Sequence, residues 1–135
     1  MSLAERQCQK CASKGGKPAL LEDSEVANYK SELCPSWEVV ELESGLCLRR
    51  QFVAKNFVSA VEFLNSLSVL AEDQGHHPDF SVTSYRTVTV TVYTHSLKGL
   101  AENDFILAAK CDKLPITYSP KFLKDNPNVI AGVSK

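Results

Sequence analysis

The sequence predicts an α+β fold: a two-layer sandwich in which a four-stranded antiparallel sheet carries three helices on one face. Two pairs of strands, over about 37–53 and 79–94, supply the sheet. A strongly amphipathic stretch separates the pairs, and helical patterns precede the first pair and follow the second. The resulting order, α-β-β-α-β-β-α, favours one sheet with its helices packed together on one side.

The first half of the chain is predicted to contain one short helix and one pair of strands. The helix is expected over 24–33, with Ser24 as its N-cap and Pro35 as the residue that stops it. The strands are expected over 37–42 and 46–53, because a short turn that contains glycine separates two apolar, alternating runs.

The central helix has the strongest periodicity in the sequence. Over 56–71 the apolar residues recur at spacings of three and four, so they form one continuous face that must be buried. Gly75 then supplies a stop, because glycine readily adopts the left-handed conformation that ends many helices.

The second half repeats the pair of strands and ends in a further helix. Strands are expected over 79–84 and 86–94, and the second alternates strictly between valines directed to the core and threonines on the other face. The aromatic residues Trp37 and Tyr85 are interpreted as core residues. A last helix is expected over 102–113, and the prolines that follow it predict irregular structure.

A length of 135 residues suits a single domain. We divide the chain into a polar N-terminal extension over 1–22, the domain over 23–114 and an irregular C-terminal tail over 115–135. The net charge of -1 gives no basic surface for nucleic acid, and no apolar run approaches the roughly 20 residues of a membrane span. We therefore expect neither nucleic acid nor membrane as a partner.

Five scattered cysteines favour reduced thiols and an intracellular location, in the cytoplasm or in an organelle such as a mitochondrion or plastid. Cys8 and Cys11 have the spacing of half a zinc site, but zinc usually takes four ligands and no second pair follows. A terminal segment that happens to hold two thiols is the simpler interpretation, so no metal site is expected.

The three histidines of the chain form the main candidate site. His76 and His77 lie side by side where the central helix ends, and Pro78 forces the residue before it into an extended conformation. His95 ends the strand that pairs nearby. Adjacent histidines in an extended segment point in different directions, so one can act while the other binds or orients. Histidine exchanges protons near neutral pH, and two imidazoles across a substrate suit general acid–base catalysis.

Two other interpretations of the histidines stay open on spacing alone. Paired histidines in a loop are more often surface residues than catalysts. Three histidines with Glu72 would also supply enough ligands for a metal. Zinc ligands, however, usually project together from one helix or strand, and a His-His-Pro segment does not converge in that way.

A longer pattern surrounds the histidines. From the central helix to the last helix it reads Glu72-x3-His76-His77-Pro78-x6-Tyr85-x9-His95-x8-Asp104. Further segments at fixed places are Trp37, Leu48-x-Arg50-x-Phe52, Lys55-x-Phe57-x2-Ala60-x2-Phe63, Gly99-Leu100 and Asp104-x2-Leu107-Ala108. From Trp37 to Asp112 the chain resembles the pterin-4a-carbinolamine dehydratase family.

The resemblance implies the fold predicted above, assembled as a homodimer or homotetramer. It implies a lyase that dehydrates a 4a-hydroxytetrahydropterin to the quinonoid dihydropterin, in the recycling of a pterin cofactor. The pterin is then the substrate, and no cofactor is expected because the leaving hydroxyl needs only a proton. The alternative is a non-enzymatic interaction protein, since animal members of the family also act as dimerisation partners of a transcription factor.

The resemblance also assigns roles to individual residues. The catalytic residues are His76, His77 and His95, with His76 and His95 as the leading acid–base candidates. Glu72 is expected to hold an imidazole in one tautomer, and Asp104 is interpreted as a structural anchor near the start of the last helix. The expected substrate-binding residues are Glu72, Gly75, Pro78, Tyr93, Thr94 and Ser96.

The sequence departs from the family pattern at two places. The family usually has Gly-Gly-Leu-Thr before the last helix, whereas this chain has Lys98-Gly99-Leu100-Ala101. Loss of the threonine removes an N-cap hydroxyl, which costs about 1 kcal/mol, and Glu102 is expected to recover part of it through the helix dipole. Ala54 stands where an aromatic residue is common. Neither change affects a predicted catalytic position.

Overall fold

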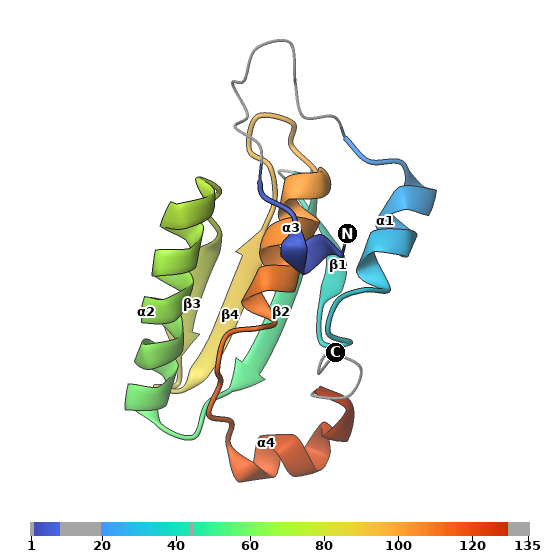
Figure 1. Ribbon diagram of the computed structural model, residues 1–135. Coiled ribbons are helices and arrows are strands. Elements are labelled where there is room, and N and C mark those ends of the chain that lie inside the picture. Colours follow the sequence, from blue (N-terminus) through green and yellow to red (C-terminus); the bar gives the residue numbers. More distant parts are fainter. Residues whose placement is uncertain (1, 9–19, 44, 130–135) are drawn as a thin grey trace.

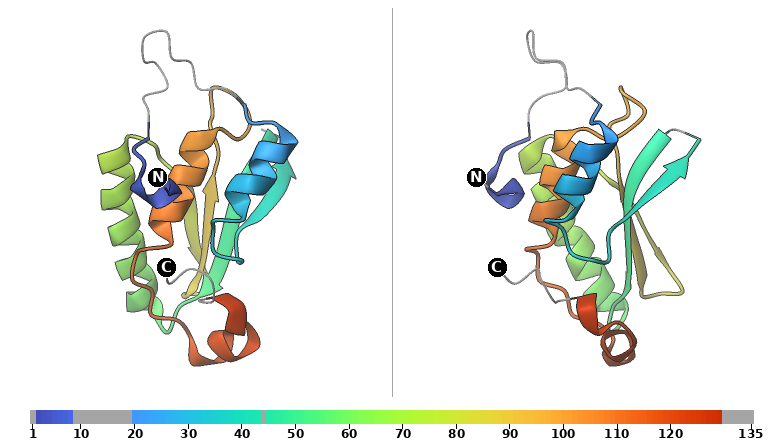
Figure 2. Two further views of the ribbon diagram at one scale, coloured as in Figure 1. Left: turned by 45° about the vertical axis from the view of Figure 1, so that its right-hand side comes forward. Right: turned by 90° about the vertical axis from the view of Figure 1, so that its right-hand side faces the viewer.

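The structure is an antiparallel sheet covered on one face by helices (Figure 1), and the right-hand view of Figure 2 shows the two layers edge-on. The computed structural model describes residues 2–8, 20–43 and 45–129. The predicted α+β two-layer sandwich is confirmed. The elements in chain order are η1 (Leu3–Glu5), α1 (Asp23–Lys30), β1 (Glu38–Leu42), β2 (Gly45–Val53), α2 (Phe57–Gln74), β3 (Asp79–Thr83), β4 (Thr87–Val92), α3 (Glu102–Cys111), α4 (Pro120–Asp125) and η2 (Pro127–Val129).

The strand order is β1-β2-β4-β3, so the two hairpins meet through their second strands. β2 and β4 pair antiparallel at the centre, with Leu48 opposite Val92 and Val53 opposite Thr87. Because both central strands are paired on two sides, the end of β4 is a firm base for the loop that follows it.

The hydrophobic core lies between the sheet and the helices. Val88, Val90 and Val92 face it from β4, as their alternation predicts, and each is at most 1% exposed. Phe52 of β2 packs edge-on against Phe63 of α2, with the ring centroids 5.0 Å apart. The helices contribute Ala60, Phe63, Leu67, Phe105, Ile106, Leu107 and Ala108 to the same core.

α2 is limited by a polar cap at one end and a glycine at the other. The Asn56 side chain accepts the backbone N–H of Ser59 at 2.8 Å, which satisfies a donor that the first turn leaves unpaired. The helix continues past its predicted end to Gln74, and Gly75 ends it at φ 65°, in the left-handed conformation. The predicted stop at Gly75 is confirmed, and His76 follows directly.

The turn between β3 and β4 corrects one prediction. Ser84 and Tyr85 have φ values of 48° and 55°, and tight hairpin turns require such positive values. Tyr85 is 61% exposed at this turn, so its assignment to the core was wrong. Trp37 is fully buried, as predicted.

The first helix starts earlier than predicted. Glu22, rather than Ser24, occupies the N-cap position, and its backbone N–H donates to the Glu25 side chain at 3.0 Å. This contact satisfies a backbone donor at the start of the helix, as the glutamate of a capping box does. Ser24 lies inside the first turn.

The tail contains a helix where its prolines had predicted irregular structure. α4 starts at Pro120, and the Ser119 hydroxyl accepts the N–H of Phe122 at 3.4 Å. Proline in the first turn of a helix lacks an N–H that would be unpaired in any case, so Pro120 is compatible with a helix start. The prediction of an irregular tail was therefore wrong for this stretch.

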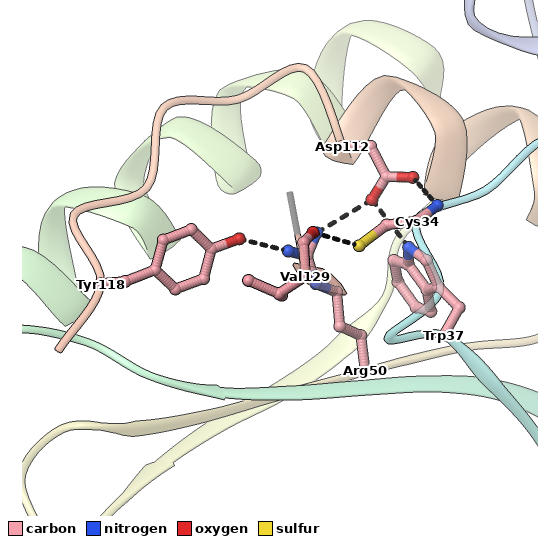
Figure 3. A network of polar contacts seen from close by, with 6 residues as sticks. All are labelled: Cys34, Trp37, Arg50, Asp112, Tyr118 and Val129. Carbon is pink, nitrogen blue, oxygen red and sulfur yellow. Dashed lines mark hydrogen bonds and ion pairs between the residues drawn. The ribbon is translucent and has the colours of Figure 1, made fainter. Parts of the chain in front are cut away.

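A buried polar network ties the tail and the entry to β1 to the end of α3 (Figure 3). Arg50 of β2 is 2% exposed and pairs with Asp112 at 2.9 Å. It also donates to the Tyr118 hydroxyl. Asp112 further accepts the Trp37 indole N–H and the Cys34 backbone N–H, each at 2.8 Å. These bonds compensate two charges that burial would otherwise make costly.

The N-terminal residues also pack against the domain. Leu3 is 1% exposed and belongs to the hydrophobic core, and η1 lies on the helical layer beside α3 (Figure 2). The polar extension predicted over 1–22 is therefore docked onto the domain at residues 2–8. Cys11, the second thiol of the half zinc site, lies outside the described residues.

Candidate active site

The segments that carry the three histidines lie at one end of the molecule, where α2 ends, β4 ends and α3 begins (Figure 1). His76 and His77 follow α2, and His95 lies in the loop between β4 and α3. A cavity of about 290 Å³ opens between these segments. Its lining residues are Gly75, His76, His77, Thr94, His95 and Ser96. The fold thus brings together two distant segments that the sequence singled out.

His76 is the buried histidine. It is 7% exposed, and its Nε2 lies 2.6 Å from Oδ1 of Asp104 in the first turn of α3. Asp104 is fully buried and accepts two further hydrogen bonds on Oδ2, from the Thr94 hydroxyl and the Ala101 backbone N–H, both at 2.8 Å. Three donors on one carboxylate compensate the cost of burying its charge.

This arrangement assigns the tautomer of His76. An ionised carboxylate can accept but not donate, so in the neutral imidazole the hydrogen lies on Nε2 and the lone pair on Nδ1. A buried carboxylate that holds one ring nitrogen also stabilises the imidazolium that forms when the other nitrogen takes a proton. The His76–Asp104 pair therefore has the geometry of an oriented general base.

His77 contacts α2, whereas His76 contacts α3. Its Nε2 lies 2.6 Å from Oε2 of Glu72 in the last turns of α2, and both side chains are exposed. Water screens such a pair, so the contact orients the ring more than it stabilises the fold. The prediction that the adjacent histidines point in different directions is confirmed, and Glu72 does contact an imidazole.

His95 reaches the cavity from the loop between β4 and α3. Its ring packs on Tyr93, with the centroids 4.3 Å apart. An antiparallel bridge at Thr94 closes the loop. The Lys98 carbonyl lies so near Gly45 that a Cβ built on Gly45 would be 1.8 Å from the carbonyl oxygen. The start of β2 at Gly45 therefore supports the loop that carries His95.

The other predicted binding residues have unequal positions. Ser96 lines the cavity and is exposed. Thr94 lines it too, but its hydroxyl is already donated to Asp104. Tyr93 and Pro78 lie outside the lining, where Tyr93 supports the ring of His95.

The direct contact between Asp104 and His76 was not predicted from the sequence. Asp104 is indeed a structural anchor, because at the third position of α3 it accepts the Ala101 N–H and satisfies a donor at a helix start without a capping hydroxyl. It also holds His76 across 28 positions of sequence. The spacing of His95 and Asp104 in the family pattern was a signal, but the partner of Asp104 appears only in the fold.

The described residues hold no group of three His, Cys, Asp or Glu side chains arranged to bind a metal ion. Within the same ranges, no helix is both long enough and apolar enough to cross a membrane. The cavity is lined by imidazole groups from two segments, and a buried carboxylate holds one of them. This set is suited to moving protons to and from a bound molecule.

The sequence matches known relatives over most of its length. The family model described as pterin 4 alpha carbinolamine dehydratase matches residues 19–114. Proteins from Rubrobacter xylanophilus and Alkaliphilus metalliredigens are 43% and 41% identical to this chain over 112 residues, 83% of its length. The aligned part covers 97% and 95% of those proteins, and both bear the name "putative pterin-4-alpha-carbinolamine dehydratase".

A solved structure shares the fold. The crystal structure of a transcriptional coactivator/pterin dehydratase from Brucella melitensis matches with a TM-score of 0.62 and 31% identity, over 70% of this chain and 96% of that chain. The family match includes the four strands, α2, α3 and the three histidines that line the cavity. This chain belongs to the pterin 4 alpha carbinolamine dehydratase family.

Proposed function

We propose that the protein is a lyase that dehydrates a 4a-hydroxytetrahydropterin to the quinonoid dihydropterin. The C4a–O bond breaks, the hydroxyl leaves as water, and loss of the N5 proton forms the C4a=N5 double bond. One group must deliver a proton to the oxygen and another must take one from the nitrogen. The observation that carries the proposal is the His76–Asp104 pair beside a cavity that two further histidines line.

The histidines divide this work according to their surroundings. His76, whose Nδ1 retains its lone pair, takes the N5 proton, and Asp104 stabilises the resulting imidazolium. His95 delivers a proton to the departing hydroxyl. His77, oriented by Glu72, binds the pterin. The scheme uses no metal or organic cofactor, because the hydroxyl leaves as water once it is protonated.

Cavity size and relatedness support the assignment. The volume of about 290 Å³ is close to the roughly 300 Å³ at the lower end of small-molecule sites. The two named relatives are aligned over nearly their whole length. The place of the reaction in recycling a pterin cofactor of hydroxylases is part of the same proposal.

The decisive experiment follows the loss of a 4a-hydroxytetrahydropterin by stopped-flow absorbance. Wild type should accelerate the dehydration well above buffer, and His76→Ala and His95→Ala should each lower kcat/KM by roughly 10²-fold or more. Tyr85→Phe, at the exposed turn between β3 and β4, serves as the control and should match wild type. A wild-type protein no faster than buffer would refute the dehydratase assignment.

An interaction function is the second candidate. The related Brucella protein is described as a transcriptional coactivator as well as a pterin dehydratase. In this chain the edge strand β3 carries Phe80, which is 47% exposed, and sheet edges readily pair with other chains. We propose a homodimer or homotetramer, which light scattering after size-exclusion chromatography would measure. A monomer at working concentration would contradict it.

A further inference from the structure

We propose that the N-terminal segment is a positioning element of the active site. The segment, residues 2–8, is called the strap below. It joins the end of α2 to the start of α3 and so holds His76 against Asp104. The catalytic part of this inference rests on the proposed dehydratase function, whereas its structural part can be tested without activity.

The strap is anchored firmly along α3. Leu3 is buried in the hydrophobic core, and its backbone N–H donates to the Glu32 side chain at 3.3 Å. Lys110 of α3 donates to the Ala4 carbonyl at 2.9 Å. Arg6 forms an ion pair with Glu102 in the first turn of α3. These contacts fix the strap on the helix that carries Asp104.

From this anchor the strap reaches α2 as well. The Cys8 backbone N–H donates to Gln74 Oε1 at 2.9 Å, and Gln74 Nε2 donates to Gln7 Oε1 at 3.0 Å. The Cys8 thiol lies 3.5 Å from the Asn103 carbonyl oxygen. Gln74 is the last residue of α2 and is 8% exposed. Residues 7 and 8 therefore bridge the ends of both helices.

The bridged residues are close to the catalytic pair in sequence. Gln74 stands two positions before His76, and Asn103 directly precedes Asp104. Gly75, between Gln74 and His76, has φ 65° and no atom within 4 Å of where a Cβ would be. The backbone N–H groups of Gly75 and His76 donate to the Glu72 and Ala71 carbonyls, both at 3.3 Å. The hydrogen bonds of Gln74 add a link to the strap at the point where the chain leaves α2.

A small displacement of His76 at this point would lower the reaction rate. Catalytic groups must be held within about 0.5 Å of their working geometry, and a displacement of about 1 Å can cost 10²-fold in rate. The His76–Asp104 contact is short, at 2.6 Å. We infer that the strap supplies part of the restraint that keeps it so.

The test replaces Gln74 with methionine in the 135-residue chain. Methionine keeps the length of the side chain and removes both hydrogen bonds to the strap, together with the contact of Gln74 with Asp73 of the same helix. We expect kcat to fall about 10-fold with little change in KM, since the strap touches α2 and α3 rather than the cavity. Gln51→Met is the matched control, because Gln51 also donates from its amide, to Thr89 at 3.0 Å, but is exposed on the sheet.

A second readout needs no substrate. In protein labelled with ¹⁵N-histidine, the Nε2–H of His76 should give a protected resonance in wild type and Gln51→Met, and a broadened one in Gln74→Met. Wild-type kcat together with an unchanged resonance in Gln74→Met would overturn the proposal and leave the strap a purely stabilising segment. If wild type lacks dehydratase activity, the proposed function fails, and the resonance alone still decides on the strap.

Discussion

Asp104 organises three neighbouring parts of the chain through one carboxylate. It accepts the Nε2–H of His76, the hydroxyl of Thr94 and the N–H of Ala101. In a neutral amide of the same shape one oxygen becomes an N–H donor, so at least one of the three contacts must reverse its direction or be lost.

Asp104→Asn should therefore lower kcat/KM by about 10²-fold or more, because it removes the charge that stabilises a protonated His76. Thr94→Val removes one neutral hydrogen-bond donor, worth about 1 kcal/mol, and should lower kcat/KM by less than tenfold. Steady-state kinetics of both variants at one pH measure the difference. Equal losses in the two variants would argue against the charge as the important property.

Cys111, at the end of α3, leads to a prediction for pH. Burial raises the pKa of its thiol from 9.0 to about 12. Between these values the unfolded chain releases the proton and the folded protein keeps it. The free energy of unfolding should therefore fall as pH rises through this window, by up to about 1.4 kcal/mol per pH unit. Urea titrations across the window, compared with Cys111→Ala, should show a steeper fall in wild type.

At the scale of elements, periodicity predicted most of the fold. The four strands, α2 and α3 follow from alternation and from helical spacing, because each pattern reflects burial of one face. α4 was missed because proline was expected to break a helix, whereas Pro120 stands at the first helical position. The docking of residues 2–8 was missed because it depends on contacts with distant segments. The core assignment of Tyr85 failed because two residues with positive φ form the turn. The histidines were predicted as a group, but the link to Asp104 requires the fold.

Two glycines with positive φ differ in the space around them. Gly75 at φ 65° has open space around it, whereas Gly45 at φ 110° touches the loop that carries His95. Gly75→Ala should cost about 1–2 kcal/mol from backbone strain alone. Gly45→Ala should lower the free energy of unfolding by more than Gly75→Ala does. It should also lower kcat, because Lys98 must move away from the new methyl group. Chemical denaturation and kinetics of the pair measure both effects. An unchanged kcat in Gly45→Ala would refute the supporting role of Gly45 at the start of β2.

Over the whole molecule, buried charges are separated along α3. Asp104 lies in its first turn, and Asp112 directly follows its last residue. Arg50 and Asp112 join β2, the entry to β1 and the tail, as Figure 3 shows, whereas Asp104 joins the parts of the site. Stability and catalysis should therefore respond to different substitutions.

Arg50→Met tests this separation. Removing one partner of a buried ion pair typically lowers the free energy of unfolding by about 3–5 kcal/mol, because the other charge stays buried without its partner. The neighbouring Arg49 is exposed and lies 3.9 Å from Glu38. Arg49→Met should lower the free energy of unfolding by no more than about 0.5 kcal/mol. Denaturant titrations compare the two variants. The kcat per folded molecule should equal that of wild type in both, and a specific loss in Arg50→Met would mean that the network reaches the site.

The network also gives the protein an optical reporter of its own. Trp37 is the single tryptophan of the chain; its indole is fully buried and donates to Asp112. Its fluorescence should shift to longer wavelength when water enters this end of the molecule. The proposed pterin, bound in the cavity at the other end of α3, should leave the surroundings of the indole as they are. The wavelength of emission therefore follows unfolding independently of occupancy, with no dye attached.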